Sequence, residues 1–78
     1  KEEKTSSLAV TLIDSGKLNA HNLSTCGIER TALDKFLKEQ RAKINKVLVM
    51  TVDGNGRVYF QKRGESYKIL QMAVNGQW

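Results

Sequence analysis

The sequence has no proline, one cysteine, one histidine and no long apolar run. Because Cys26 is alone, the chain cannot form an internal disulfide, and a lone thiol favours a reducing compartment. Cys26 and His21 cannot supply the four ligands of a closed zinc site, so we expect no metal and no cofactor. No stretch approaches the roughly 18 apolar residues that a membrane helix needs, and no signal-peptide pattern is present.

The residues that are present describe a small globular domain. Of the 78 residues, 40% are apolar and 27% are charged, a balance typical of a folded chain rather than a disordered one. So short a chain buries little core, and its stability should be marginal without a partner, metal or disulfide. The net charge of +5 suits an anionic partner, although solubility alone also explains it. Because the sequence starts at Lys1, we expect a fragment whose parent carries any membrane spans elsewhere.

The first half of the sequence predicts one strand and two helical segments. Residues 8–14 are apolar and β-branched, which indicates a strand, and Ser15-Gly16 follows as a turn into a brief return strand. Residues 19–26 suit a short helical turn closed by Gly27. Residues 28–42 are the clearest helix, because apolar side chains recur on one face at helical spacing: Ala32, Leu33, Phe36 and Leu37.

The second half predicts a β-hairpin. Residues 46–52 and 57–62 are apolar strands joined by Asp-Gly-Asn-Gly at 53–56, where glycine and asparagine tolerate the positive φ of a tight turn. We expect at least one of Gly54 and Gly56 to have positive φ. Residues 66–74 indicate a further strand or a swapped arm, and residues 75–78 a frayed end.

These elements predict an α+β fold. It consists of a small mixed or antiparallel sheet, one long amphipathic helix, one short helical turn and a C-terminal β-hairpin. We divide the chain into a flexible N-terminal segment at 1–7, an α+β module at 8–63, and an extra strand or arm at 64–78.

Residues 6–62 resemble the C-terminal soluble region of the YetF family of bacterial membrane proteins. Residues 8–18 (LAVTLIDSGKL) resemble its apolar strand followed by a D-G turn. Residues 21–27 (HNLSTCG) match its x-N-L-x-x-x-G segment at three positions: Asn22, Leu23 and Gly27. Residues 28–40 and 47–60 resemble its amphipathic helix and apolar hairpin. Two departures are Ser15 in place of Asp before Gly16, and Glu29 in place of a better helix cap.

This resemblance implies a place in a larger protein and a cellular location rather than a catalytic activity. The chain would be the second of two soluble subdomains that follow a few membrane helices. It would lie on the cytoplasmic side of the bacterial inner membrane, and the fragment itself would be soluble.

The sequence offers no catalytic constellation. Gly54 to Gly56 would need a following helix and a Lys-Ser/Thr pair to act as a phosphate loop, and both are missing. No G-x-S-x-G pattern surrounds Ser15, and Asp14, Asp34 and Asp53 do not cluster in sequence. We therefore expect no enzyme, no catalytic residue and no cofactor-binding or metal-binding residue.

Two surfaces are predicted from charge and apolarity. The first is a basic patch, for which a solvated face is the default interpretation and an anionic lipid surface the favoured partner: Lys35, Lys38, Arg41, Lys43 and Lys46. The second is a self-association surface on the strand at 46–52, which is apolar on both sides while only one long helix is available to cover it. Val47 and Val49 are assigned to one side and the self-association residues to the other: Leu48, Met50 and Val52.

We expect a non-enzymatic assembly or regulatory domain of a bacterial membrane protein. Its partners would be a second copy, its sister subdomain or membrane helices, and an anionic lipid surface. The rival functions are a basic nucleic-acid-binding module and a small-ligand sensor whose pocket lies between helix and sheet. Nucleic acid is not expected as a partner, because few aromatic residues lie among the basic ones.

Overall fold

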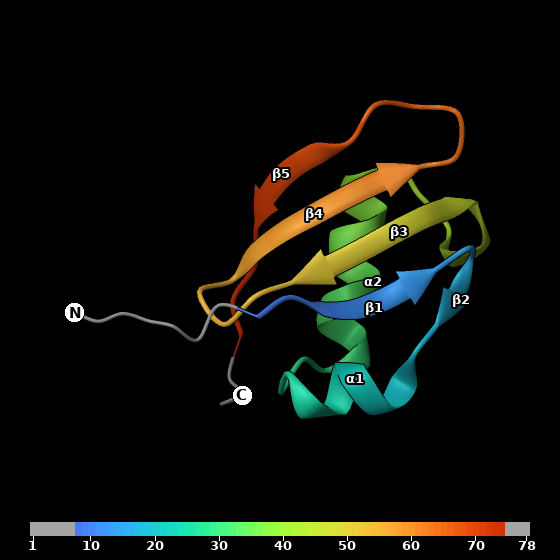
Figure 1. Ribbon diagram of the computed structural model, residues 1–78. Helices are drawn as coiled ribbons and strands as arrows, with labels where there is room; N and C mark the ends of the chain where they lie inside the picture. Colours follow the sequence, from blue (N-terminus) through green and yellow to red (C-terminus); the bar gives the residue numbers. More distant parts are fainter. Residues whose placement is uncertain (1–7, 75–78) are drawn as a thin grey trace.

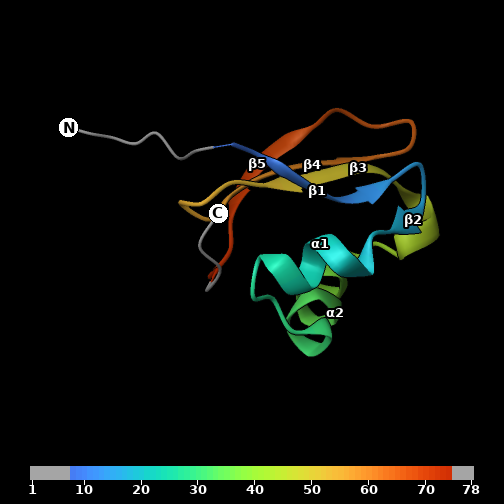
Figure 2. The same cartoon turned by 60° about the horizontal axis from the view of Figure 1, so that its bottom comes forward.

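The computed structural model describes residues 8–74, and within them one antiparallel sheet lies against two helices on one side (Figures 1 and 2). The strand order is β2-β1-β3-β4-β5. The strands are β1 (Val10–Asp14), β2 (Lys17–Leu18), β3 (Val47–Val52), β4 (Arg57–Lys62) and β5 (Lys68–Gln71). The helices are α1 (Ala20–Thr25), α2 (Arg30–Glu39) and a 3-10 turn, η1 (Ile44–Lys46).

The α+β prediction is confirmed, with every strand pair antiparallel. The C-terminal segment is a strand, because β5 pairs with β4 and extends the sheet rather than folding over it. The segments called flexible (1–7) and frayed (75–78) lie outside the described residues.

The turn between β1 and β2 requires two residues with positive φ. Ser15 has φ of 51° and Gly16 has φ of 81°, the pattern of a two-residue hairpin turn that favours Asn or Asp followed by Gly. The turn is also held from β3, since the Ser15 amide donates to the Leu48 carbonyl at 2.7 Å and the Gly16 amide to the Val47 carbonyl at 2.8 Å. Ser15 is therefore tolerated at a position that a better turn residue would stabilise.

Helix α1 explains the Asn-Leu-x-x-x-Gly spacing. The Asn19 side chain caps the helix by accepting from the Asn22 amide, and the Asn22 side chain donates to the Thr11 carbonyl at 2.8 Å. Leu23 enters the core, and Gly27 ends the helix with φ of 67°. The motif thus fixes α1 to strand β1.

Helix α2 is shorter than the predicted span of 28–42. Its N-cap, Glu29, makes no capping hydrogen bond with its side chain, which confirms the weak cap read from the sequence. After the C-cap Gln40, the chain leaves the helix because Arg41 adopts φ of 55°. The α2 side chains that enter the core are Leu33, Phe36 and Leu37, whereas Ala32 is exposed.

The β3–β4 hairpin closes as the sequence predicts. The Asp53 carboxylate accepts from the Asn55 and Arg57 amides at 2.9 and 3.0 Å, and the Gly56 amide donates to the Asp53 carbonyl at 3.0 Å. Gly56 has φ of 83°, which confirms the expectation of a positive φ in this loop. The Gly56 carbonyl then accepts from the Met72 amide at 2.8 Å, so the loop also holds the segment after β5.

The core lies between the helices and one face of the sheet. Phe36 of α2 meets Phe60 of β4 edge to face, with ring centroids 5.6 Å apart. The pairing register shifts between Thr11 and Ile13 and again between Val47 and Val49. The first of these bulges lets two adjacent residues of β1, Leu12 and Ile13, both be fully buried.

Candidate functional site

The sheet face opposite the helices is uncovered within residues 8–74 (Figure 2). The strand register places four residues in one row across it: Thr11, Thr51, Tyr59 and Ile69. A second row holds Asp14, Val49 and Gln61. We call these seven residues the open face.

The centre of the open face is uncharged and only partly accessible. Thr11, Val49, Thr51, Tyr59 and Gln61 are half-buried by their own neighbours, and Ile69 is 53% exposed. Charged residues lie around this centre rather than in it: Asp14 and its cross-strand partner Lys17 at one end, and Arg57 toward the hairpin loop.

A tyrosine pair gives the open face its aromatic character. Tyr59 and Tyr67 stack with ring centroids 4.8 Å apart and an interplanar angle of 12°. The Tyr59 hydroxyl donates to the Gln61 side chain at 3.3 Å, and the Gln61 amide group donates to the Glu65 carbonyl at 2.9 Å. These contacts connect the β4–β5 turn to the face and keep the Tyr67 ring on it, where its side chain is 56% exposed.

The predicted self-association residues require a correction. Met50 and Val52 are fully buried in the core on the helix side, and Leu48 is half-buried at the β3 bulge. The alternation along β3 holds for Met50 and Val52, but the helices cover that side. Val47, predicted on the opposite side, is also fully buried in the core, because the bulge between Val47 and Val49 breaks the alternation. The uncovered side of β3 therefore presents Val49 and Thr51 instead.

The predicted basic patch divides between two flanks of α2. Lys38 and Lys43 line a hollow on the side of η1, whereas Lys35 lines a separate groove beside Gln71 and Met72. Arg41 and Lys46 lie at the end of the molecule where α2 stops and β3 begins.

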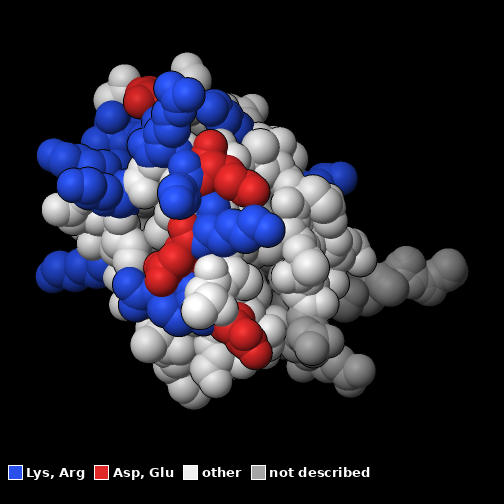
Figure 3. All heavy atoms as spheres, turned by 180° about the vertical axis from the view of Figure 1, so that it is seen from behind, with Lys and Arg blue, Asp and Glu red and all other residues white. Residues whose placement is uncertain are grey.

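Two further cations join that end from β4 and the turn after it. The Lys62 ammonium donates to the Gln40 carbonyl at 3.3 Å, and the Arg63 amide donates to the Lys46 carbonyl at 2.9 Å. Figure 3 shows Lys and Arg side chains gathered over one part of this side of the molecule, with Asp and Glu among them. We call the following six residues the basic end: Lys38, Arg41, Lys43, Lys46, Lys62 and Arg63.

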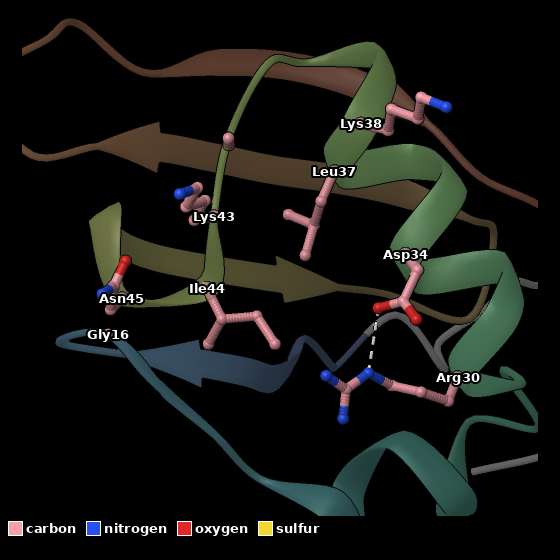
Figure 4. A pocket seen from close by; sticks show the side chains of 9 residues that line it. Gly16, Arg30, Asp34, Leu37, Lys38, Lys43, Ile44 and Asn45 are labelled. Atoms are coloured by element: carbon pink, nitrogen blue, oxygen red, sulfur yellow. Dashed lines mark hydrogen bonds and ion pairs between the residues drawn. The ribbon is translucent and has the colours of Figure 1, made fainter.

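A shallow hollow lies beside α2. It encloses about 580 Å³ and is open to solvent. Its lining residues come from α2, from the segment between α2 and β3, and from the β1–β2 turn: Gly16, Arg30, Asp34, Leu37, Lys38, Ala42, Lys43, Ile44 and Asn45. Figure 4 shows Leu37 and Ile44 pointing into this space from opposite sides.

The residues that could act as nucleophiles or metal ligands do not come together in one site among residues 8–74. Cys26 is fully buried in the core, and burial raises the pKa of its thiol, so it is held protonated and is a poor nucleophile. Among residues 8–74, no three His, Cys, Asp or Glu side chains are placed to hold a metal ion. Within the same residues, no helix is both long enough and apolar enough to cross a membrane.

Comparison with family models, with curated proteins and with solved structures finds no match. The candidate surfaces therefore rest on the geometry of this chain alone.

Two features of these surfaces were missed from the sequence. Tyr67 lies just before β5, outside any strand, so no alternation in the sequence indicates which face it shares with Tyr59. Only the register that pairs Tyr59 with Ile69 places Tyr67, two residues earlier, on the same face. Arg30 and Arg63 were outside the predicted basic patch. Arg63 joins it only because β4 returns beside η1, where its amide donates to the Lys46 carbonyl.

Proposed function

We propose that this chain is a non-enzymatic assembly module that packs its open face against another protein surface, with a second copy as the simplest partner. The observation that carries the proposal is the uncharged row of Thr11, Thr51, Tyr59 and Ile69, which lies on the side of the sheet without helices.

The composition of the open face supports a protein partner. Cores of protein interfaces are depleted of charge and enriched in tyrosine, and a polar rim surrounds them. The Tyr59–Tyr67 stack supplies a rigid aromatic surface, and the charged residues Asp14, Lys17 and Arg57 lie at its margins. A second copy presents the same margins with both signs of charge, so two open faces do not simply repel each other.

The size of the face sets the expected strength. Four strands about 4.8 Å apart and five residues of about 3.3 Å each give a projected area of roughly 300 Å². A standard interface buries about 800 Å² on each partner. The isolated module should therefore self-associate weakly, and it would assemble stably only where a parent protein holds copies close together.

The resemblance to the YetF family suggests where that would happen. In that setting the module would lie on the cytoplasmic side of a bacterial inner-membrane protein. Its open face would meet another copy, the sister subdomain or the membrane helices of the parent.

Sedimentation velocity across a concentration series tests the assembly role. The unmodified chain should show a mass above one protomer at the highest concentrations, because the uncharged row of the open face is then covered. Ile69→Lys places a charge in the row and should shift the chain to monomer. Thr31→Lys adds the same charge to the exposed side of α2 and should behave as the unmodified chain does. Equal masses for both variants at every concentration would contradict the proposal.

The basic end supports a second candidate function, contact with an anionic membrane surface. Six cations gather there from α2, η1, β4 and the segments that join them. Each contributes about 1 kcal/mol at most near an anionic bilayer, so binding should be weak and should disappear at high salt. Sedimentation with phosphatidylglycerol vesicles should exceed sedimentation with neutral vesicles, and equal sedimentation with both would count against this function.

A further inference from the structure

The hollow beside α2 combines free positive charge with an apolar floor. The cations come from both ends of α2 and from the segment after it: Arg30, Lys38 and Lys43. Asp34 is the one acidic residue among the lining residues, and its carboxylate already accepts from the Arg30 Nε at 2.9 Å. That pair uses Nε, so the two Nη groups of Arg30 remain available as donors, and Figure 4 shows one of them on the side of Ile44.

A fourth cation reaches the same rim from the segment after β4. The Arg63 Nε donates to the Asn45 carbonyl at 3.4 Å. Its Nη2 lies over Gly16, since a Cβ atom built on that glycine would be 3.2 Å from it. Within residues 8–74, neither Lys38 nor Lys43 makes an ion pair. The hollow and its rim therefore carry four cations against one acid.

The floor between these cations is apolar. Leu37 is almost fully buried, while Ala42 and Ile44 are half-buried and pack against the edge of the core. A purely inorganic anion would use the cations and leave this floor wet. An organic anion would cover the floor and place its charge among the cations at the same time.

We propose that this hollow is a binding site for a small organic anion, a phosphate or carboxylate that carries a short apolar group. The charged head would lie between the Arg30 guanidinium and the Lys43 ammonium, and the apolar group would lie on Ala42 and Ile44, the half-buried residues of the floor. This site is separate from the open face, and its failure would leave the proposed assembly function untouched.

A matched set of probes tests the contributions of the charged head and of the apolar group of the ligand separately. We would titrate the isotope-labelled chain with hexyl phosphate, inorganic phosphate and 1-hexanol, and follow the backbone amide signals by NMR. Hexyl phosphate should give saturable shifts for residues that line the hollow, with an affinity at least about tenfold higher than that of either fragment. Equal affinities for hexyl phosphate and inorganic phosphate would show an adventitious ion only and would overturn the proposal.

Variants locate the site and control for net charge. Lys43→Glu should weaken hexyl phosphate binding at least about tenfold, whereas Lys68→Glu, the same charge change on β5, should leave it unchanged. Ile44→Ser should weaken hexyl phosphate but not inorganic phosphate. Equal losses in Lys43→Glu and Lys68→Glu would mean diffuse attraction and would refute the site. Binding to phosphatidylglycerol vesicles without any binding of soluble hexyl phosphate would also refute it, in favour of a membrane surface.

Discussion

Gly27 and Arg41 occupy the same position in two identical helix-ending motifs. After α1, the Gly27 amide donates to the Ser24 carbonyl and the Ile28 amide to the Leu23 carbonyl. After α2, the Arg41 amide donates to the Lys38 carbonyl and the Ala42 amide to the Leu37 carbonyl. Both are Schellman motifs, and both central residues have positive φ, 67° for Gly27 and 55° for Arg41. One motif has the favoured glycine and the other does not.

Arg41→Gly should therefore stabilise the fold. Removing the Cβ relieves the left-handed strain at this position, and the expected gain is about 0.5–1 kcal/mol in the free energy of unfolding. The matched change Gly27→Arg should destabilise by a similar amount or more, because it introduces the same strain after α1. Urea denaturation of the two variants measures both effects. A loss of stability in Arg41→Gly would mean that the arginine side chain contributes more than its backbone costs.

Substitutions at Gly56 and Gly64 distinguish the cost of backbone strain from the cost of close packing. Their φ angles are nearly equal, 83° and 78°. A Cβ on Gly56 would overlap the Met72 carbonyl oxygen and lie 2.7 Å from the side-chain Nε2 of Gln71. A Cβ on Gly64 would meet nothing within 4 Å. Gly64→Ala should cost about 1 kcal/mol from strain alone. Gly56→Ala should cost clearly more, because β5 and the segment after it must also move.

Thermal unfolding of the two alanine variants tests this comparison. Equal losses would show that the contact between the hairpin loop and the segment after β5 does not hold the fold together.

Cys26 should be unreactive in the folded chain. Its side chain is fully buried and burial raises the pKa of the thiol above its ordinary 9.0, so the thiolate is scarce at neutral pH. Labelling by a thiol reagent should be slow in buffer and fast in denaturant. Rapid labelling of the native chain would contradict the buried position.

The same raised pKa predicts a loss of stability at alkaline pH. The folded state keeps the thiol proton where the unfolded state releases it, so this contribution is present below about pH 9 and falls as the pH rises through the folded-state pKa. Cys26→Ala should lack this part of the pH dependence, while costing about 1 kcal/mol or more for the cavity it leaves. Unfolding free energies of both chains at pH 7 and at higher pH measure the difference.

Local signals in the sequence were sufficient for most of the elements. The Asp-Gly-Asn-Gly loop, the apolar spacing of Leu33, Phe36 and Leu37, and the glycine after α1 each predicted the observed structure. The early end of α2 was not predicted, because Arg41 gives no warning of a left-handed backbone. The brief strand β2 was read correctly from the turn at Ser15-Gly16.

The surfaces depended on long-range packing and were harder to predict. Alternation along β3 separated Val49 from Met50 and Val52 but failed for Val47, which the bulge at Leu48 places in the core with them. It also did not reveal which side α2 covers, so Met50 and Val52 were assigned to the wrong surface. Likewise, the spacing of lysines along α2 did not reveal that Lys35 and Lys38 line opposite flanks of the helix. Both errors have the same cause, since register and helix placement are properties of the assembled sheet.

Dilution NMR tests the assembly account most directly, because it reports both association and its location. Amide spectra would be recorded from low concentration up to about 1 mM, where even weak self-association is populated. The account predicts that signals from the open face, including Thr51, Tyr59 and Ile69, shift with concentration while those of Leu33 and Phe36 in α2 stay fixed. Spectra that do not change with concentration, or changes confined to α2 and the basic end, would contradict it.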